Sequence, residues 1–339
     1  MKHIWFSGHD VRAVAEIAGA SFSGSWSMPD FALPAPQLLH TIKSISDQGL
    51  KEISFEVKDT TVVIAGGELR ATLRKFAPAQ GDDASSFILR DPPVGQRTKV
   101  TPEWWSGVKR LGFSACRDDT KMPLRGIFWT DGGVLLSTDT YRITTLIHAK
   151  AERIAAPVRG GVLIPDHLIS RLGSAIRDAC EIGLEGDSIM WAFMPGGFAY
   201  GSLPAGDFPV AGCSAQVKSI REAVRSGGTS ATLPDGITAA LDRILYFAQP
   251  PTYRIDAEID GSALCLMATA AEGFAEERIA LANVKGSGGK FAINGRYLRD
   301  ALTEVGRNVW VPPGGGPSPS VAYFASDDRK IEHLIMLLA

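Results

Sequence analysis

The hydrophobic and polar residues of the chain follow one order several times: a short apolar run, a residue that favours the start of a helix, and a helical pattern. Pro, Ser, Thr and Asn are common at the N-cap or first position of a helix. Such residues follow the apolar runs that end at Phe6, Leu33, Val100, Ile164, Leu233 and Ile293. Apolar residues then recur three or four positions apart, as at Leu298 and Leu302. The pattern predicts six short amphipathic helices.

Alternating apolar and polar segments follow five of these six predicted helices. They are broken by Gly or Asp-Gly turns, and they lie at residues 51–76, 125–149, 180–204, 252–281 and 307–338. Such segments are typical of antiparallel meanders. The helix starts lie 60 to 69 residues apart, except that only 27 residues separate Ser7 from Pro34. That interval has room for a strand and a helix but not for a meander, so we predict an abbreviated first unit.

Pairs of these units make plausible domains, because one helix and one meander bury too little apolar surface alone. The polar or Pro-containing stretches at 90–99 and 221–230 are the candidate boundaries. We therefore predict an α+β protein with three tandem domains of antiparallel sheets, at residues 1–97, 98–226 and 227–339. The first of the three is the abbreviated one.

Composition indicates an ordinary globular protein, with 45% hydrophobic and 21% charged residues among 339. No apolar run is long enough to span a membrane, and the start has neither the basic nor the apolar region of a signal peptide. We expect a cytoplasmic protein without a membrane partner. The four cysteines, Cys116, Cys180, Cys213 and Cys265, are too far apart for a C-x-x-C zinc site or a disulfide framework.

Charge and motifs argue against two further classes of protein. The net charge of −2 is unlike that of a protein that coats nucleic acid through a basic surface, so any DNA contact is expected to be local or topological. The six histidines are dispersed, GSGGK at 286–290 lacks P-loop spacing, and neither G-x-S-x-G nor H-E-x-x-H occurs. We expect no catalytic residue, cofactor or metal.

Five segments, in order along the chain, resemble motifs of the bacterial DNA polymerase sliding clamp, the β subunit of the replicative DNA polymerase III. They are RDDTKMPLRGIFW (117–129), STDTYRITT (137–145), GDFPV (206–210), FAINGRYLRDAL (291–302) and HLIMLLA (333–339). The second is similar to the family's A-T-D-G-H-R-L-A, and the fourth to its F-N-x-x-Y-L-x-D-A-L. Departures include Arg125 for Asn, Thr140 and Tyr141 for Gly-His, and Leu337 and Ala339 for Pro and Arg. A divergent or phage-encoded member would show such departures.

The resemblance implies a DNA-clamp fold whose helices line a pore. Two chains would assemble head to tail into a homodimeric ring around duplex DNA. The protein would be a non-catalytic processivity factor that tethers DNA polymerase, and both polymerase and clamp loader would dock through short linear peptides.

The resemblance also implies a peptide-binding pocket. Its wall would comprise Leu124, Thr138, Tyr141, Arg142, Ile143, Pro209, Asn294, Tyr297, Ser320, Val321, Leu334 and Met336. A groove of this kind, apolar with a few polar groups and a methionine, suits varied peptide anchors. The sequence leaves open that the three buried-type residues Leu124, Ile143 and Leu334 are simply core.

Every predicted helix carries at least one basic residue, as helices that face phosphates require. The candidate DNA-binding residues are Arg12, Lys43, Lys109, Arg110, Arg171, Arg177, Arg243, Arg296 and Arg299. Each of them taken singly is equally explained as part of a solvated helix face.

Two other functions stay open at this point. A clamp-derived protein that cannot close a ring would sequester clamp-binding peptides, and the abbreviated first domain supports this alternative. An unrelated multidomain enzyme would need a bound cofactor or a clustered polar cleft that the sequence does not reveal.

Overall fold

The computed structural model describes residues 3–15, 18–48, 52–76, 92, 97–148, 153–166, 168–169, 181–186, 188–194, 197–204, 206–313 and 321–338, with side chains from residue 32 onward. The chain divides into two compact units. One comprises Met1–Pro102 with Ser170–Leu203, and the other comprises Glu103–Ile169 with Pro204–Ala339. No described helix is long and apolar enough to cross a membrane.

The first unit contains a six-stranded antiparallel sheet and a smaller meander. The six strands are, in spatial order, β1 (His3–Ala15), β2 (Ala18–Pro34), β13 (Gly197–Ser202), β12 (Ile189–Met194), β11 (Glu181–Glu185) and β6 (Arg97–Lys99). The meander is β3 (Ser54–Val57), β4 (Thr61–Gly66) and β5 (Leu69–Arg74). Helix α1 (Ala35–Asp47) contributes Leu38 and Ile45 to a core with Val62 and Ile64 of this meander. The predicted helix after Leu33 and the predicted meander at 51–76 are confirmed.

The helix predicted after Phe6 is wrong, because this segment is the strand β1, and the candidate DNA-binding residue Arg12 therefore lies on a strand. The backbone of β1 pairs with β2 along its length, with Val11 opposite Phe22 and Arg12 opposite Ser21. β-Branched valines favour strands over helices. Strand pairing also provides hydrogen-bond partners for backbone N–H and C=O groups, some of which would lack partners at the ends of a short helix.

The second unit is built on a nine-stranded antiparallel sheet. Its strands are, in spatial order, β10 (Val162–Pro165), β7 (Gly126–Trp129), β8 (Val134–Thr138), β9 (Arg142–Ile147), β22 (Ile331–Met336), β21 (Val321–Ala325), β20 (Asn308–Val311), β14 (Thr229–Thr232) and β18 (Ala282–Lys285). At its centre β9 pairs with β22, which places His333 opposite Thr144, 189 positions earlier. The meanders predicted at 125–149 and 307–338 thus form one sheet.

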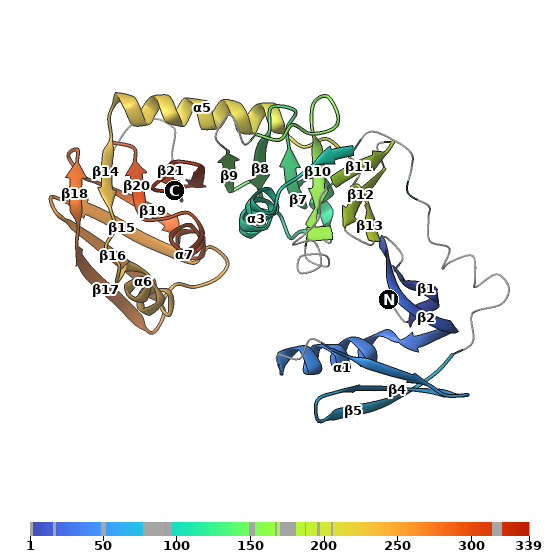
Figure 1. Cartoon of the computed structure of the whole chain (residues 1–339). Coiled ribbons are helices and arrows are strands. Elements are labelled where there is room, and N and C mark those ends of the chain that lie inside the picture. The colour runs from blue at the N-terminus through green and yellow to red at the C-terminus, as the bar shows by residue number, and fades with distance from the viewer. Residues whose placement is uncertain are drawn as a thin grey trace. The chain divides into compact units, whose positions relative to one another are not determined.

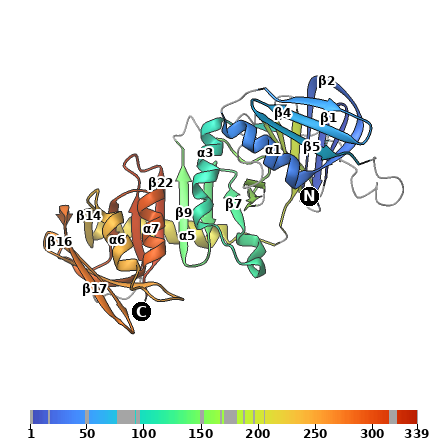
Figure 2. The same ribbon diagram turned by 90° about the horizontal axis from the view of Figure 1, so that it is seen from below.

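Helices cover both faces of this sheet. Figure 1 shows α5 (Val210–Ser226) running along one side, and Figure 2 shows α3 (Pro102–Leu111), α6 (Ile237–Leu245) and α7 (Gly295–Glu304) on the other. A four-stranded sheet has the order β17 (Gly273–Ala280), β16 (Ala263–Ala270), β15 (Arg254–Asp260) and β19 (Gly289–Asn294). Short 3₁₀ helices η1 (Gly112–Ser114) and η2 (Asp119–Leu124) follow α3. Helices α3, α6 and α7 and the meander at 252–281 confirm the predictions.

Helix α5 was not predicted from the sequence patterns. It contributes Cys213, Val217 and Ile220 to the core beneath it, at the spacing of one helix face. The same core contains residues of both central meanders, such as Phe128 and Trp310. One helix therefore covers strands from two distant parts of the chain.

Some expectations lie outside the described residues. After Ile164, only Asp166, Leu168 and Ile169 of the expected helix are described, and these three are helical. Arg171, Arg177, Cys180 and Ser320 fall in undescribed segments. The domain boundaries after residues 97 and 226 stay predictions.

A buried chain of hydroxyl groups ends at His333 on β22. Thr144 Oγ1 donates to Ser114 Oγ at 2.6 Å, and it lies 2.7 Å from His333 Nδ1. Because the Thr144 hydroxyl is used as a donor, it accepts from Nδ1–H, and the neutral ring then carries no proton on the buried Nε2. Burial, assisted by the charge of Arg142, lowers the pKa of His333 to about 3.

We predict that His333 weakens the fold in acid. The unfolded imidazole titrates near its ordinary pKa of about 6.5, so between roughly pH 6.5 and pH 3 the unfolded state binds more protons. As the pH is lowered through this range, this group should reduce the free energy of unfolding by up to about 1.4 kcal/mol per pH unit. His333→Asn should flatten that slope, measured by urea denaturation at several pH values. His40→Asn, at an exposed position on α1, should not. Equal slopes for both variants would contradict the assignment.

Candidate functional site

An apolar pocket of about 210 Å³ opens beside the central strands of the second unit. It is lined by Leu124, Thr138, Thr140, Tyr141, Arg142, Ile143, Pro209, Gly212, Cys213, Gln216, Val321, Leu334 and Met336. Nine of the twelve residues predicted for the peptide-binding wall are among them. The structure therefore brings together most of a set whose members lie up to 212 positions apart.

The three other predicted wall residues are placed differently. Asn294 caps α7, where its Oδ1 accepts from the backbone N–H groups of Arg296 and Tyr297. Tyr297 lines the neighbouring cleft described below, and Ser320 lies outside the described residues. Four lining residues were not predicted from the sequence, namely Thr140, Gly212, Cys213 and Gln216. Three of these belong to α5, whose repeat of apolar positions after GDFP was the signal that could have revealed it.

The floor of the pocket is also the core of the unit. Leu124, Ile143 and Leu334 are buried and pack in the cluster that α5 covers. These residues therefore belong to the core, as the sequence left open, and the same side chains line the pocket; their role in binding a peptide stays a prediction. The rim is different, because Tyr141 is 56% exposed and Met336 is 47% exposed.

The turn between β8 and β9 shapes the rim. Thr138 Oγ1 accepts from the Thr140 backbone N–H and donates to the Arg142 carbonyl at 2.7 Å. Asp139 Oδ1 accepts from the Tyr141 and Arg142 backbone N–H groups. These bonds hold Thr140 at a φ of +83°, a left-handed conformation that costs a β-branched residue about 1–3 kcal/mol. Turn geometry thereby fixes where Tyr141 stands.

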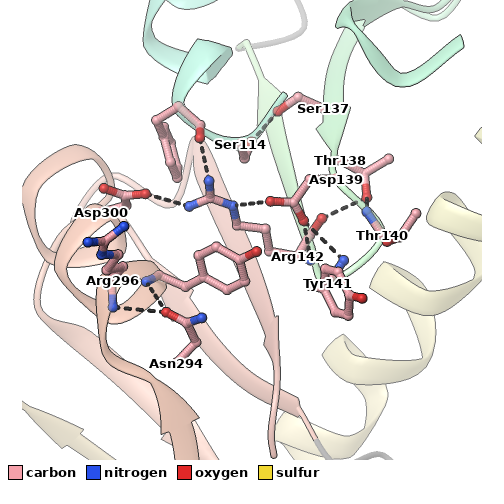
Figure 3. Close-up of polar contacts among 12 residues, drawn as sticks. Ser114, Ser137, Thr138, Asp139, Thr140, Tyr141, Arg142, Asn294, Arg296 and Asp300 are labelled. Atoms are coloured by element: carbon pink, nitrogen blue, oxygen red, sulfur yellow. Dashed lines mark hydrogen bonds and ion pairs between the residues drawn. The ribbon is translucent and has the colours of Figure 1, made fainter. Parts of the chain in front are cut away.

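Arg142 forms the densest polar network at the site (Figure 3). Its Nε donates to Asp139 at 2.8 Å, its Nη1 to Asp300 of α7 at 2.6 Å, and its Nη2 to the Phe113 carbonyl at 2.6 Å. The guanidinium also lies over the ring of Tyr297, 4.2 Å from its centroid. Because Arg142 is only 8% exposed, these contacts compensate a buried charge and tie β9 to α7.

A second, polar cleft of about 950 Å³ shares Tyr141 and Arg142 with the apolar pocket. Its remaining charged lining residues are Arg117, Asp118, Lys121, Asp139, Asp242, Arg296, Arg299 and Asp300. Tyr246, Tyr253 and Tyr297 add aromatic surface. Burial, followed by the neighbouring Asp139 carboxylate, raises the pKa of Tyr297 to about 12, so its phenol stays protonated.

The predicted DNA-binding residues are only partly free to bind another molecule. Lys109 on α3 and Lys43 on α1 are exposed. Arg243 of α6 pairs with Glu277, and Arg299 of α7 pairs with Asp242. Arg110 donates to the Glu304 carbonyl, and the guanidinium of Arg296 stacks on Tyr253. In the second unit these residues lie on the helices that share one side of the nine-stranded sheet (Figure 2).

Metal chemistry receives no support from the described side chains. No group of three or more His, Cys, Asp or Glu among them is arranged to hold a metal ion. Cys213 lines the apolar pocket, and burial raises its pKa, which makes it a poor nucleophile. Thr138, Asp139 and Arg142 are engaged in holding the turn and α7 in place.

Three known structures share this arrangement of sheets and helices. The DNA polymerase III subunit beta from Pseudomonas aeruginosa matches with a TM-score of 0.70 and 19% identity, over 100% of this chain and 92% of that one. This chain therefore has the sliding-clamp fold. A P. aeruginosa sliding clamp bound to griselimycin gives a TM-score of 0.71 at 20% identity, over 100% and 90% of the two chains.

The third sliding clamp, from Borrelia burgdorferi in complex with a natural product, gives a TM-score of 0.75 at 15% identity, over 100% of this chain and 91% of that one. No protein-family profile and no curated protein matches the sequence. The predicted α+β sliding-clamp fold is thus confirmed, in a sequence that has diverged far from these clamps.

We predict that Arg142 stabilises this clamp fold far more than its exposed partner does. Arg142→Met would leave the Asp139 carboxylate, which is 13% exposed, without its positive partner and the Phe113 carbonyl without a donor, at a cost of about 3 kcal/mol. Asp300 is 41% exposed, so Asp300→Asn should cost less than about 1 kcal/mol. Chemical denaturation followed by tryptophan fluorescence compares the two. Equal losses would show that the Arg142 network does not carry this stability.

Proposed function

We propose that the protein is a DNA sliding clamp, a processivity factor that encircles duplex DNA and holds DNA polymerase through a peptide in the apolar pocket. One observation carries the proposal. In a chain with the sliding-clamp fold, nine residues chosen from sequence motifs line a single pocket. It would work as a non-catalytic protein of the cytoplasm, and a clamp loader would use the same pocket.

The chemistry of the pocket suits a short linear peptide. A buried aliphatic floor binds an apolar anchor, and the flexible Met336 at the rim adapts to anchors of different shape. The exposed side-chain amide of Gln216 can meet a peptide backbone or amide. Such a site binds partners without changing them chemically, as tethering requires.

Encirclement explains how a protein of net charge −2 would stay on DNA. Only some of the basic residues on α3, α6 and α7 lack partners in the chain, so direct contacts to phosphates would be weak and screened by salt. A closed ring needs no strong contacts. A ring requires a second copy of the chain, and we include a head-to-tail homodimer in the proposal.

Met336→Ala should weaken peptide binding about tenfold while the protein stays folded. The side chain is half-exposed at the rim, so truncation costs binding rather than core stability. Isothermal titration calorimetry with a polymerase peptide that carries apolar anchors measures the effect. Met267→Ala is the matched control, because this methionine is also partly exposed but lies on β16. Leu334 is unsuitable, since its truncation would cost about 2–5 kcal/mol of core stability. Equal affinity of both variants would remove the pocket from the proposal.

Protein loaded onto nicked circular DNA should survive about 0.5 M salt, at which the Debye length is roughly 4 Å and exposed ion pairs are screened. It should leave once the circle is cut, because a ring slides off an end. Gel filtration of the complexes before and after cutting measures retention. Equal retention on circular and linear DNA would replace encirclement with ordinary DNA affinity.

Molar mass in solution separates the ring from its alternative. Light scattering should give twice the 36.2 kDa of one chain. A strict monomer that still binds peptide would instead support a clamp-derived protein that sequesters clamp-binding peptides.

A further inference from the structure

The polar cleft beside the apolar pocket contains more basic side chains than its carboxylates pair with. Asp139 and Asp300 are both bonded to Arg142, and Asp242 is paired with Arg299 at 2.8 Å. Asp118 is exposed, and its Oδ1 already accepts from the backbone N–H and hydroxyl of Thr120. Its carboxylate is therefore partly used to hold η2.

Three basic residues of the cleft remain without a carboxylate partner. Within the described part of the chain, no carboxylate oxygen lies within 4 Å of the charged nitrogens of Arg117, Lys121 or Arg296. Arg117 and Arg296 are exposed and Lys121 is half-buried. Arg296 is held in place because its guanidinium stacks 3.6 Å above the centroid of Tyr253. The cleft thus presents positive charge to whatever enters it.

Lys121 lies at the border between the cleft and the apolar pocket. Its Nζ is 3.5 Å from Thr140 Oγ1 and 5.8 Å from the centroid of the Tyr141 ring. Tyr141 and Arg142 line both spaces, so an extended chain anchored in the pocket would continue over Tyr141 into the cleft. The first charged group that it would meet there is Lys121.

We propose that the cleft binds an acidic residue that flanks the apolar anchor of the same docking peptide, with Lys121, Arg117 and Arg296 as its cationic partners. The inference rests on the proposed peptide-binding function and adds to it the chemical class of the preferred partner. Lys121 is the specificity-determining residue because it lies nearest to the anchor.

The charges of the wall favour a peptide carboxylate over a nucleic-acid strand. A strand brings one phosphate per nucleotide, whereas the lining has five basic residues against four carboxylates, which leaves little net positive charge for a polyanion. One or two side-chain carboxylates need only the three basic residues that have no paired carboxylate. Tyrosines in the cleft could stack on bases, so the experiment includes a single-stranded oligonucleotide.

The experiment measures a coupling between Lys121 and the acidity of the peptide. Two labelled peptides share one apolar anchor and carry either Asp-Asp or Asn-Asn beside it. At about 50 mM salt, where screening is weak, we expect the acidic peptide to bind about tenfold more tightly to the full-length protein by fluorescence polarisation. Lys121→Met, which keeps the aliphatic stem, should reduce that ratio to about twofold or less. Lys218→Met, at an exposed lysine of α5, should leave the ratio unchanged.

The charge-reversed variant Lys121→Glu supplies an independent check. It should reverse the preference, so that a peptide with Lys-Lys beside the anchor binds more tightly than the acidic one. A ratio near one for the unmodified protein, with both peptides weakened by Met336→Ala, would overturn this inference and leave the proposed function standing. Failure of both peptides to bind would instead contradict the proposed function itself. An oligonucleotide whose binding is lost in Lys121→Met, with no peptide preference, would assign the cleft to nucleic acid and also overturn the inference.

Discussion

The pairing of β9 with β22 is the constraint on which the rest of the second unit depends. β22 is the fifth of nine strands, and its successive side chains point to opposite faces of the sheet. On the face covered by α5, Leu334 closes the floor of the pocket and Met336 forms its rim. On the other face, His333 meets Thr144 and the ring of Phe113. Six residues thus contribute to both the pocket and the buried structure that supports it.

Buried polar groups fix the register of this pairing. Glu332 accepts from both Nε and Nη2 of Arg221 of α5 and from the Tyr323 hydroxyl, so α5 is tied to the central strand by charge as well as by packing. Arg142 makes the equivalent connection to α7 on the opposite face. Moving β22 by one residue would turn Glu332 to the other face and separate its charge from Arg221, which costs several kcal/mol. The apolar residues alone would tolerate more alternatives than this network does.

Local chemistry explains which parts of the fold could be predicted from sequence. The meanders were predictable because alternation and Gly turns encode them directly, and so was α7, where Asn294 is an N-cap that bonds two backbone N–H groups. The strand β1 was not predictable by pattern, since its hydrogen-bond partners lie on β2 and that pairing outweighs a local helix signal. α5 was missed because Pro209 and its small residues resemble a linker until the core beneath Val217 is known.

The candidate site shows the same division. Motif resemblance located the pocket floor, because those residues sit on strands whose patterns are clear. The Arg142 contacts to Asp300 and Phe113 were beyond the sequence, since they join a strand end to a helix more than 150 positions later and to a backbone carbonyl. The basic residues of the cleft that have no carboxylate partner could not be predicted either. Which of them are unpaired depends on the ion pairs that form in the folded structure.

The central position of β22 also orders events during synthesis. Every other strand of the nine-stranded sheet precedes β22 in the chain, yet four strands lie on each side of it. Until residues 331–336 have left the ribosome, β9 and β21 are two separate edges, and neither the floor nor the rim of the pocket exists. The pocket therefore cannot form before the sheet is complete. The topology delays its assembly until folding of this unit has finished.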